Sequence, residues 1–256
     1  MSARRALPHP TVRSRARRRP ASRVAAASGL AVGVLVAVTA CVPFVTPGDT
    51  RTENREIDDA TAVVLRGSGD VTIRLGEAPS LTVTGGENVL ERLTTEVEGD
   101  ALIIDMQRGP IVVGARDLVF DITLTSLESV LISGSGDMTA EFGDADEVTL
   151  EIRGSGEIET DELDASTVRA SISGSGSIRP SGTTDELHVN VDGSGDVDAS
   201  ELSADSARVV LSGSGEISVD ASESLDVVLS GSGTVRYSGR PEIRSTVSGS
   251  GEITPS

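Results

Sequence analysis

The sequence predicts an all-β fold, a parallel β-solenoid of stacked coils with about 20 residues each. The first of three observations is the tripeptide Gly-Ser-Gly, which occurs eight times, with its first glycine at positions 67, 134, 154, 174, 193, 213, 231 and 249. From the second copy onward, successive copies lie 20, 20, 19, 20, 18 and 18 residues apart. A regular period of this size is typical of an array in which each supersecondary unit stacks on the next.

The second observation is a set of apolar columns around the tripeptide. Two residues before the first glycine, all eight copies carry Val, Leu or Ile, and four residues after it they carry Val, Ile or Met. Four residues before it, every copy except the last, which has Ser245, is apolar. Because alternate side chains of a strand share one face, this spacing predicts two strands joined by a sharp bend at the tripeptide, which we call the glycine corner. A longer strand enters this corner and a shorter one leaves it.

The third observation is the pair of glycines that flanks each serine. Glycine reaches a positive φ without a Cβ clash, and coils that stack at a corner approach each other closely there. We expect the eight serines to serve turn chemistry. An antiparallel meander, with the tripeptide as a hairpin loop, is the alternative. The unequal strands, and an apolar residue in a second, polar corner (Leu163 and Leu202), favour the solenoid.

These motifs also carry a family resemblance. The SGSGD and SGSGE turns, the opening LRGSGDVTIRLGEAPSLTVTGGENVLERLTTEVEGDALII and the closing VSGSGEIT resemble the bacterial family described as "putative auto-transporter adhesin, head GIN domain". The resemblance covers about residues 58–256. It implies a single-stranded right-handed parallel β-helix, in agreement with the solenoid, and an adhesin-like role.

The chain begins with an export signal. Residues 1–23 carry eight arginines and no acidic residue, residues 24–40 are 17 uncharged and mostly apolar residues, and Cys41 follows Ala40. This pattern is typical of a secretory signal, and the cysteine directly after the cut resembles the bacterial lipoprotein signal. We therefore expect residues 1–40 to be a signal peptide cleaved between Ala40 and Cys41, and Cys41 to be acylated. An uncleaved anchor helix is the alternative.

Beyond the signal, the sequence divides into two parts. Residues 41–57 contain two prolines and show no apolar period after Val45, which predicts a flexible tether. Residues 58–256 form the predicted solenoid domain. The 67-residue step from Gly67 to Gly134 holds no further tripeptide and leaves room for about three coils.

The two ends of the stack differ in sequence. Residues 81–83, 101–104 and 118–122 predict strands, and 87–93 predicts one or two helical turns that cover the N-terminal end. The last strands, over 248–253, have no such cover. An unpaired strand edge recruits other chains, so the C-terminal end is open to end-to-end self-association.

The charge of the exported part excludes one class of partner. Eight of the 22 basic residues and none of the 40 acidic ones lie in the leader, which leaves 14 against 40, a net charge of −26, with no lysine. Phosphate binding needs clustered positive charge, so we expect no nucleic-acid partner. Such acidity keeps an aliphatic repeat protein soluble and repels anionic lipid surfaces.

An outward row of acids follows the glycine corner. Three residues after the first glycine, six of the eight copies carry Asp or Glu, and Ser177 and Thr234 interrupt the row. A solvated face is the simpler interpretation, because carboxylates one coil apart in water repel by only about 1 kcal/mol. The alternative is a calcium ladder, as in glycine-rich β-rolls, whose ligands would be Asp70, Asp137, Glu157, Asp196 and Glu216.

Catalysis has little support in the sequence. The only histidine after the leader is His188, at an outward strand position, and Gly-Ser-Gly lacks the spacing of a nucleophile elbow. The arginines are scattered, Tyr237 is the only tyrosine and there is no tryptophan, whereas sugar-binding faces usually use aromatic rings. We therefore expect His188 to be a surface residue and the protein not to be an enzyme.

Together these features predict a non-catalytic, lipid-anchored extracytoplasmic protein of the cell envelope, without a cofactor, that displays a rigid acidic solenoid as an adhesion-like or scaffold module. Its expected partners are the membrane, through the acyl chain, and an envelope or extracellular protein or polysaccharide. The alternative function is a polysaccharide-binding or polysaccharide-cleaving β-helix of the envelope.

Overall fold

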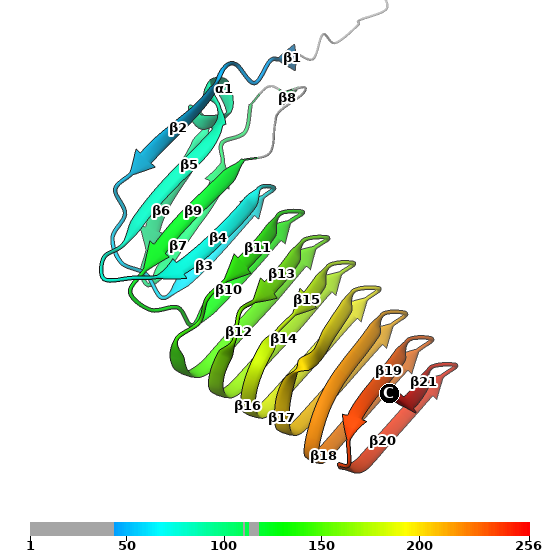
Figure 1. Ribbon diagram of the computed structural model, residues 1–256. Helices are drawn as coiled ribbons and strands as arrows, with labels where there is room; N and C mark the ends of the chain where they lie inside the picture. Colours follow the sequence, from blue (N-terminus) through cyan, green and yellow to red (C-terminus); the bar gives the residue numbers. More distant parts are fainter. Residues whose placement is uncertain (1–43, 110, 113–117) are drawn as a thin grey trace, which may run out of the picture. The chain divides into compact units, whose positions relative to one another are not determined.

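The computed structural model describes residues 44–109, 111–112 and 118–256 (Figure 1). Residues 1–41 and 42–256 are separate units, and only the second contains described residues. The expected signal peptide over 1–40 and the expected lipidation site at Cys41 therefore lie outside the described residues.

Strands on both sides of the glycine corners build the coils. The strands that enter a corner are β3 (Ala62–Gly67), β10 (Ser129–Gly134), β12 (Asp144–Gly154), β14 (Leu163–Gly174), β16 (Ser181–Gly193) and β20 (Glu242–Gly249). Those that leave one are β4 (Asp70–Leu75), β11 (Asp137–Ala140), β13 (Glu157–Thr160), β15 (Ser177–Arg179), β19 (Thr234–Gly239) and β21 (Glu252–Pro255). Two long strands, β17 (Asp196–Gly213) and β18 (Glu216–Gly231), run from one glycine corner to the next.

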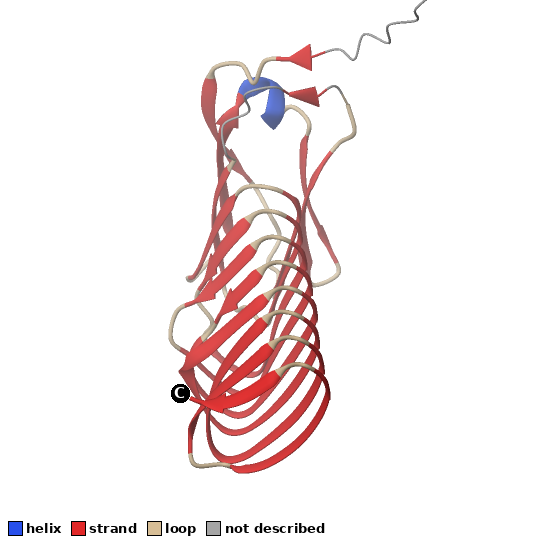
Figure 2. Cartoon of the chain, turned by 90° about the vertical axis from the view of Figure 1, so that its right-hand side faces the viewer, coloured by secondary structure: helices blue, strands red, loops and turns tan. Residues whose placement is uncertain are grey.

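Successive coils pair in parallel and in register. Gly134 pairs with Gly154, which pairs with Gly174, and the same register continues to Gly249. Figure 2 shows the resulting stack of open coils, with the glycine corners along one side. The β-solenoid prediction is confirmed. The antiparallel meander is wrong, because strands on the two sides of a corner pair in parallel with the neighbouring coils and not with each other.

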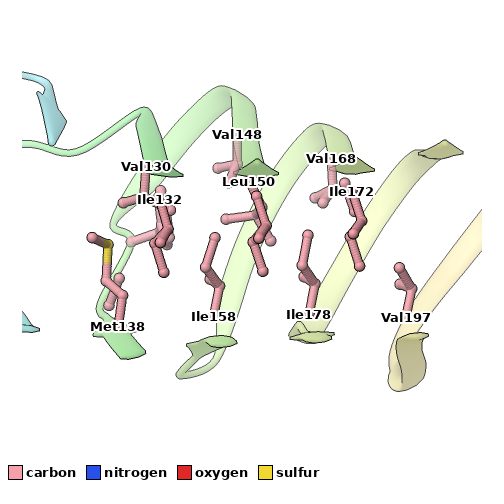
Figure 3. Close-up of a cluster of buried hydrophobic side chains, with 14 of the residues drawn as sticks. Val130, Ile132, Met138, Val148, Leu150, Ile158, Val168, Ile172, Ile178 and Val197 are labelled. Atoms are coloured by element: carbon pink, nitrogen blue, oxygen red, sulfur yellow. The ribbon is translucent and has the colours of Figure 1, made fainter. Parts of the chain in front are cut away.

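The apolar columns predicted from the sequence form the core. Ile132, Ile152 and Ile172 lie above one another at 0–2% exposure and face the column of Met138, Ile158 and Ile178 from the other strands (Figure 3). Burying one such side chain stabilises the fold by roughly 1.5–3 kcal/mol. The leaving strands have a second inward position, six residues after the first glycine, which the sequence reading missed. It is apolar in some coils, as at Ile73 and Val219, but small or polar in others, as at Ala140 and Thr160, and this mixture explains the omission.

The spatial order of the coils differs from their order in the chain. β3 lies between β10 and β7 (Ala101–Met106), and β4 lies between β11 and β9 (Val119–Leu124). Gly67 therefore stacks directly on Gly134, and no coils separate them. The expectation of about three coils in this interval is wrong, because the intervening residues fold on the other side of β3 and β4.

These intervening residues close the N-terminal end of the stack, which we call the capped end. β5 (Ser80–Gly86) pairs antiparallel with β9, and β6 (Leu93–Glu98) pairs antiparallel with β7. Helix α1 (Glu87–Leu90) buries Val89 and Leu90, in agreement with the predicted helical turns. The short strands β1 (Phe44–Val45) and β8 (Ile111–Val112) pair in parallel nearby.

Part of the expected tether is folded. Within 41–57, residues Thr50–Arg55 form β2, which pairs antiparallel with β5, and Ile57 packs against the core. The sequence gives no apolar alternation there because β2 is an edge strand whose side chains lie largely in solvent.

The glycine corner makes a strong prediction for stability. Gly174 has φ +136°, and a Cβ built on it would lie 2.2 Å from the carbonyl oxygen of Gly154 in the preceding coil. Gly174→Ala should therefore lower the free energy of unfolding by about 3 kcal/mol or more, through backbone strain and displacement of the neighbouring coil. Urea unfolding followed by circular dichroism measures this change.

Two further glycine positions separate the effect of backbone strain from that of contact with the neighbouring coil. Gly67 has φ +140° with no atom within 4 Å of an added Cβ, so Gly67→Ala should cost only the strain of about 1–2 kcal/mol. At Gly156 no positive φ occurs, but its Cβ would meet the carbonyl oxygen of Gly136 at 2.3 Å. If Gly174→Ala is no more destabilising than Gly67→Ala, close stacking does not restrict this corner.

A second prediction concerns acid stability. The hydroxyl and the backbone N–H of Thr125 donate to the carboxylate of Asp59, which holds the pKa of this group below its ordinary value of 3.8. A depressed folded-state pKa stabilises the fold above the ordinary value, and the contribution disappears as pH falls through the folded pKa. Asp59→Asn should therefore be less stable than the wild type at pH 7, and the difference should shrink below about pH 4. Urea unfolding of the wild type and the variant at pH 7 and below about pH 4 tests this. A difference in the free energy of unfolding that does not depend on pH would contradict the prediction.

Candidate functional site

The glycine corner itself serves stacking. In every copy after the first, the backbone N–H of the tripeptide serine donates to the carbonyl oxygen of the first glycine in the preceding copy, for example Ser155 to Gly134 at 2.9 Å and Ser175 to Gly154 at 2.8 Å. The serine side chains are exposed along this edge. The hydrogen bonds and the close glycine contacts account for the tripeptide, in line with the structural interpretation of its serines.

The acid row lies on the outer face of the leaving strands. Asp70, Asp137 and Glu157 are neighbours in register, and Ser177 separates Glu157 from Asp196. Arg179 forms an ion pair with Glu157, and Arg236 forms one with Glu216. Within 44–109, 111–112 and 118–256, no group of three or more His, Cys, Asp or Glu side chains is arranged to hold a metal ion. The geometry agrees with a solvated face partly neutralised by arginine.

The remaining candidate groups are distributed over the surface. His188 lies on the outer face of β16, with Nε2 3.5 Å from Oε2 of Glu186, and its neighbours in register are Arg169 and Arg208. Arg169 pairs with Glu147, and Arg153 pairs with Glu151. Arg169 and Arg153 are thus each partly neutralised by an acid, while Arg169 and Arg208 lie on either side of His188 in successive coils.

A feature that the sequence reading missed lies at the second corner, opposite the glycines. Two adjoining hollows share Asp164, Ala165 and Ser166, and the larger has a volume of about 680 Å³. One extends toward the capped end over Thr125–Glu128 and Asp144–Glu147; the other extends over Thr183–Asp185 and Ser203–Asp205. We call the two together the corner groove. It crosses several coils, perpendicular to the strands that form it.

A three-residue pattern builds the corner groove. Each coil contributes a polar, a small and a polar residue, and the register aligns them: Asp144, Asp164, Thr183 and Ser203 form one row, and Ala145, Ala165, Thr184 and Ala204 form the next. The pattern begins ten residues before the first glycine in these coils, so aligning the copies over this segment would have revealed it.

The chemistry of the corner groove is acidic and hydroxyl-rich. The hydroxyl of Thr183 donates to Oδ1 of Asp164 at 3.3 Å, and that of Ser222 donates to Oδ1 of Asp205 at 3.2 Å, so hydroxyls of one coil donate to carboxylates of the coil before it. Among the described residues, none that lines either hollow is basic. Such a surface repels anionic polymers and suits neutral or cationic ones, whose hydroxyl or amino groups can donate to carboxylates.

The fold and these surfaces agree with a comparison to known families. The family model described as "Putative auto-transporter adhesin, head GIN domain" matches residues 59–241. The chain belongs to this family. No curated protein is significantly similar to this head GIN domain protein.

Solved structures share this fold. A putative adhesin from Bacteroides fragilis is 20% identical, with a TM-score of 0.77 over 83% of this chain and 100% of that one. A putative lipid binding protein from Parabacteroides distasonis is 26% identical, with a TM-score of 0.69 over 84% of this chain and 100% of that one. A putative adhesin from Parabacteroides merdae is 20% identical, with a TM-score of 0.67 over 83% and 99%.

The single helix of the described residues, α1, has four residues, and the described part of the chain offers no helix with the length and apolarity needed to cross a bilayer.

The acid row predicts the response to calcium. Because its carboxylates are solvated or paired with arginine, adding calcium to chelated protein should leave the melting temperature unchanged. A ligand that binds only the folded state would raise it. Differential scanning calorimetry with EDTA, then with excess calcium, measures this, with magnesium as the control. A rise specific to calcium would support the calcium ladder.

Proposed function

We propose that this head GIN domain protein is a non-catalytic, lipid-anchored surface protein of the cell envelope, which displays its solenoid as an adhesion-like or scaffold module. The observation that carries the proposal is the register of the coils. Equivalent outward residues lie directly above one another from β3 to β20, so the surface consists of continuous rows of similar side chains. Such rows suit an extended ligand, and the descriptions of the family and of its solved relatives as adhesins support this role.

Anchoring would act through the N-terminal side of the chain. An acylated Cys41 would hold the protein in the membrane, and the chain enters the solenoid at the capped end, through β1 and β2. A single acyl chain gives reversible binding, so further acyl groups on the same cysteine would be needed for a stable anchor. The net charge of −26 over residues 41–256 would keep the solenoid away from anionic headgroups.

The corner groove supports a second candidate, binding of an envelope polysaccharide. Its carboxylates and hydroxyls suit neutral or amino sugars rather than uronic acids, because the described lining carries no basic side chain. The "lipid binding" description of the Parabacteroides distasonis protein finds less support in this chain, since both hollows are lined mainly by polar residues.

The anchoring part of the proposal is tested by moving the thiol. Cys41→Ser should abolish labelling of the protein by radioactive palmitate in cells and shift it from the detergent phase to the aqueous phase in a phase-separation assay. Cys41→Ser combined with Thr46→Cys keeps one cysteine but displaces it, and should not restore labelling, because acylation requires the residue directly after the cut. Labelling of either variant would contradict the lipoprotein signal.

The display part is tested with residues 42–256, which form one compact unit. Labelled protein should bind intact envelope material saturably, and Gly174→Val, which disrupts the stack, should bind at least tenfold less. Binding that is equal in both would leave the display role without support. Competition by neutral but not by anionic glycans would indicate the polysaccharide candidate.

A further inference from the structure

The C-terminal end of the stack, formed by β20 and β21, is open. β20 pairs with β18 along one edge, and none of the described strands pairs with its other edge. Ile243 is 39% exposed and Val247 is 46% exposed, whereas Leu225 and Leu229, which lie beneath them in register, are 0% and 1% exposed. The open end therefore presents core side chains together with a row of unpaired backbone donors and acceptors.

The capped end is closed differently. Its edge strands carry charges, among them Glu53, Glu96 and Glu98, and charged edges resist the addition of further strands. Inside the cap, Arg55 donates to the carbonyl oxygens of Leu93 at 2.8 Å and Leu90 at 3.0 Å. Covering this end with another chain would bury charges, whereas covering the open end would bury aliphatic side chains.

The charge of the chain also changes at the open end. Residues 234–256 carry three arginines and two acidic residues, a net charge of +1 in side chains, while residues 41–233 carry 11 arginines and 38 acidic residues, a net charge of −27. Two copies would repel each other through nearly all of their surfaces. The open end is where two copies can approach without this repulsion.

We propose that the open end binds a second copy of this chain, tail to tail, through antiparallel pairing of β20 with β20. A two-fold axis perpendicular to the sheet keeps the inner face of each strand on the same side, so the two cores become continuous. Such an interface is closed and stops at a dimer. Head-to-tail stacking would instead place the open end against the charged cap and continue without limit.

The sequence of β20 selects one register for this pairing. With Ser245 opposite Ser245 of the second copy, Ile243 lies opposite Val247 of the second copy, and both pairs face the core. A register centred on Arg244 would place two arginines opposite each other, and one centred on Thr246 would place Val247 opposite Ser245. Cross-strand aliphatic pairs stabilise a sheet, and like charges directly opposite destabilise it.

This contact gives the adhesion-like role a mechanism, and in that respect it rests on the proposed function. The chain enters at the capped end, and the open end is the far end of the solenoid (Figure 1). In a tail-to-tail dimer the two tethers leave at opposite ends, so the dimer can join two membranes that carry the protein. Many weak pairs acting together would hold such surfaces.

Sedimentation velocity of residues 42–256 tests the contact independently of any anchor. Mass should rise with concentration and level off at twice the monomer mass. Val247→Lys should weaken the dimer at least tenfold, because it places a charge inside the junction. Val228→Lys is the matched control: Val228 is 41% exposed on the outer face of β18, and its variant should dimerise normally. A monomer at all concentrations, growth beyond a dimer, or equal effects of the two variants would overturn the proposal.

A single cysteine tests the register. Residues 42–256 contain no cysteine, and opposite residues of an antiparallel pair have Cα atoms about 4.5–5.5 Å apart, within the range of a disulfide. Ser245→Cys should form a covalent dimer under mild oxidation, and Ser230→Cys, an exposed position on β18, should not. Equal cross-linking of both variants would contradict the register centred on Ser245.

Vesicles distinguish failure of the contact from failure of the proposed function. Residues 42–256, tethered through their N-terminus to neutral phosphatidylcholine vesicles, should cluster them, and Val247→Lys should not. Dimers in solution without clustering would retain the contact and refute the bridging of membranes. Absence of native acylation at Cys41 would remove the anchor but leave the dimer intact.

Discussion

The structure depends on the close approach of backbones at the glycine corner. There a serine N–H of one coil reaches the carbonyl oxygen of the first glycine in the coil before it, at 2.8–2.9 Å throughout the row. A Cβ built on the first glycine of the serine's own tripeptide would lie about 2 Å from that same oxygen, so only glycine permits the contact. A slip of one residue would bring a side chain into this space and turn every inward residue outward. The corner therefore fixes the register on which the aliphatic core depends.

A fixed register also determines the surfaces. Positions that repeat in sequence become rows in space, so similar outward residues add along the stack instead of being dispersed. Arginines at adjacent positions partly neutralise the negative charge of the acid row, as Arg179 does in its ion pair with Glu157. The corner groove has no such compensation and remains acidic. One protein thus presents rows of different chemistry on different sides, which is a reasonable basis for a display role.

The two ends of the solenoid differ in how their edge strands are covered. At the capped end the chain reverses into antiparallel strands, places charges along the new edges and buries Val89 and Leu90, and Arg55 donates to the carbonyl oxygens of Leu90 and Leu93. At the open end the last described coil resembles the others, and Ile243 and Val247, which continue the inward columns, remain exposed. The change of local charge over the last 23 residues coincides with this end, and together these features distinguish it from the rest of the surface.

The sequence alone determined the repeating unit: the parallel strands, the glycine corner, the inward columns and the family. It could do so because each coil repeats the same local geometry, so eight aligned copies reinforce one signal. The folded strand within 50–55 escaped notice because an edge strand in solvent needs no apolar period. The corner groove escaped it because hydroxyls, carboxylates and alanines lack a strong pattern until the copies are aligned on that segment.

Only the tertiary structure decided which coils are neighbours. Nothing local in β3 indicates that it pairs with β7 on one side and with β10 on the other, since any two coils with matching columns can stack. The position of β3 follows from the antiparallel cap that residues 80–106 build, and that choice depends on long-range packing. The same packing closes one end of the solenoid with the antiparallel strands of residues 80–106, whereas at the other end none of the described strands pairs with the free edge of β20.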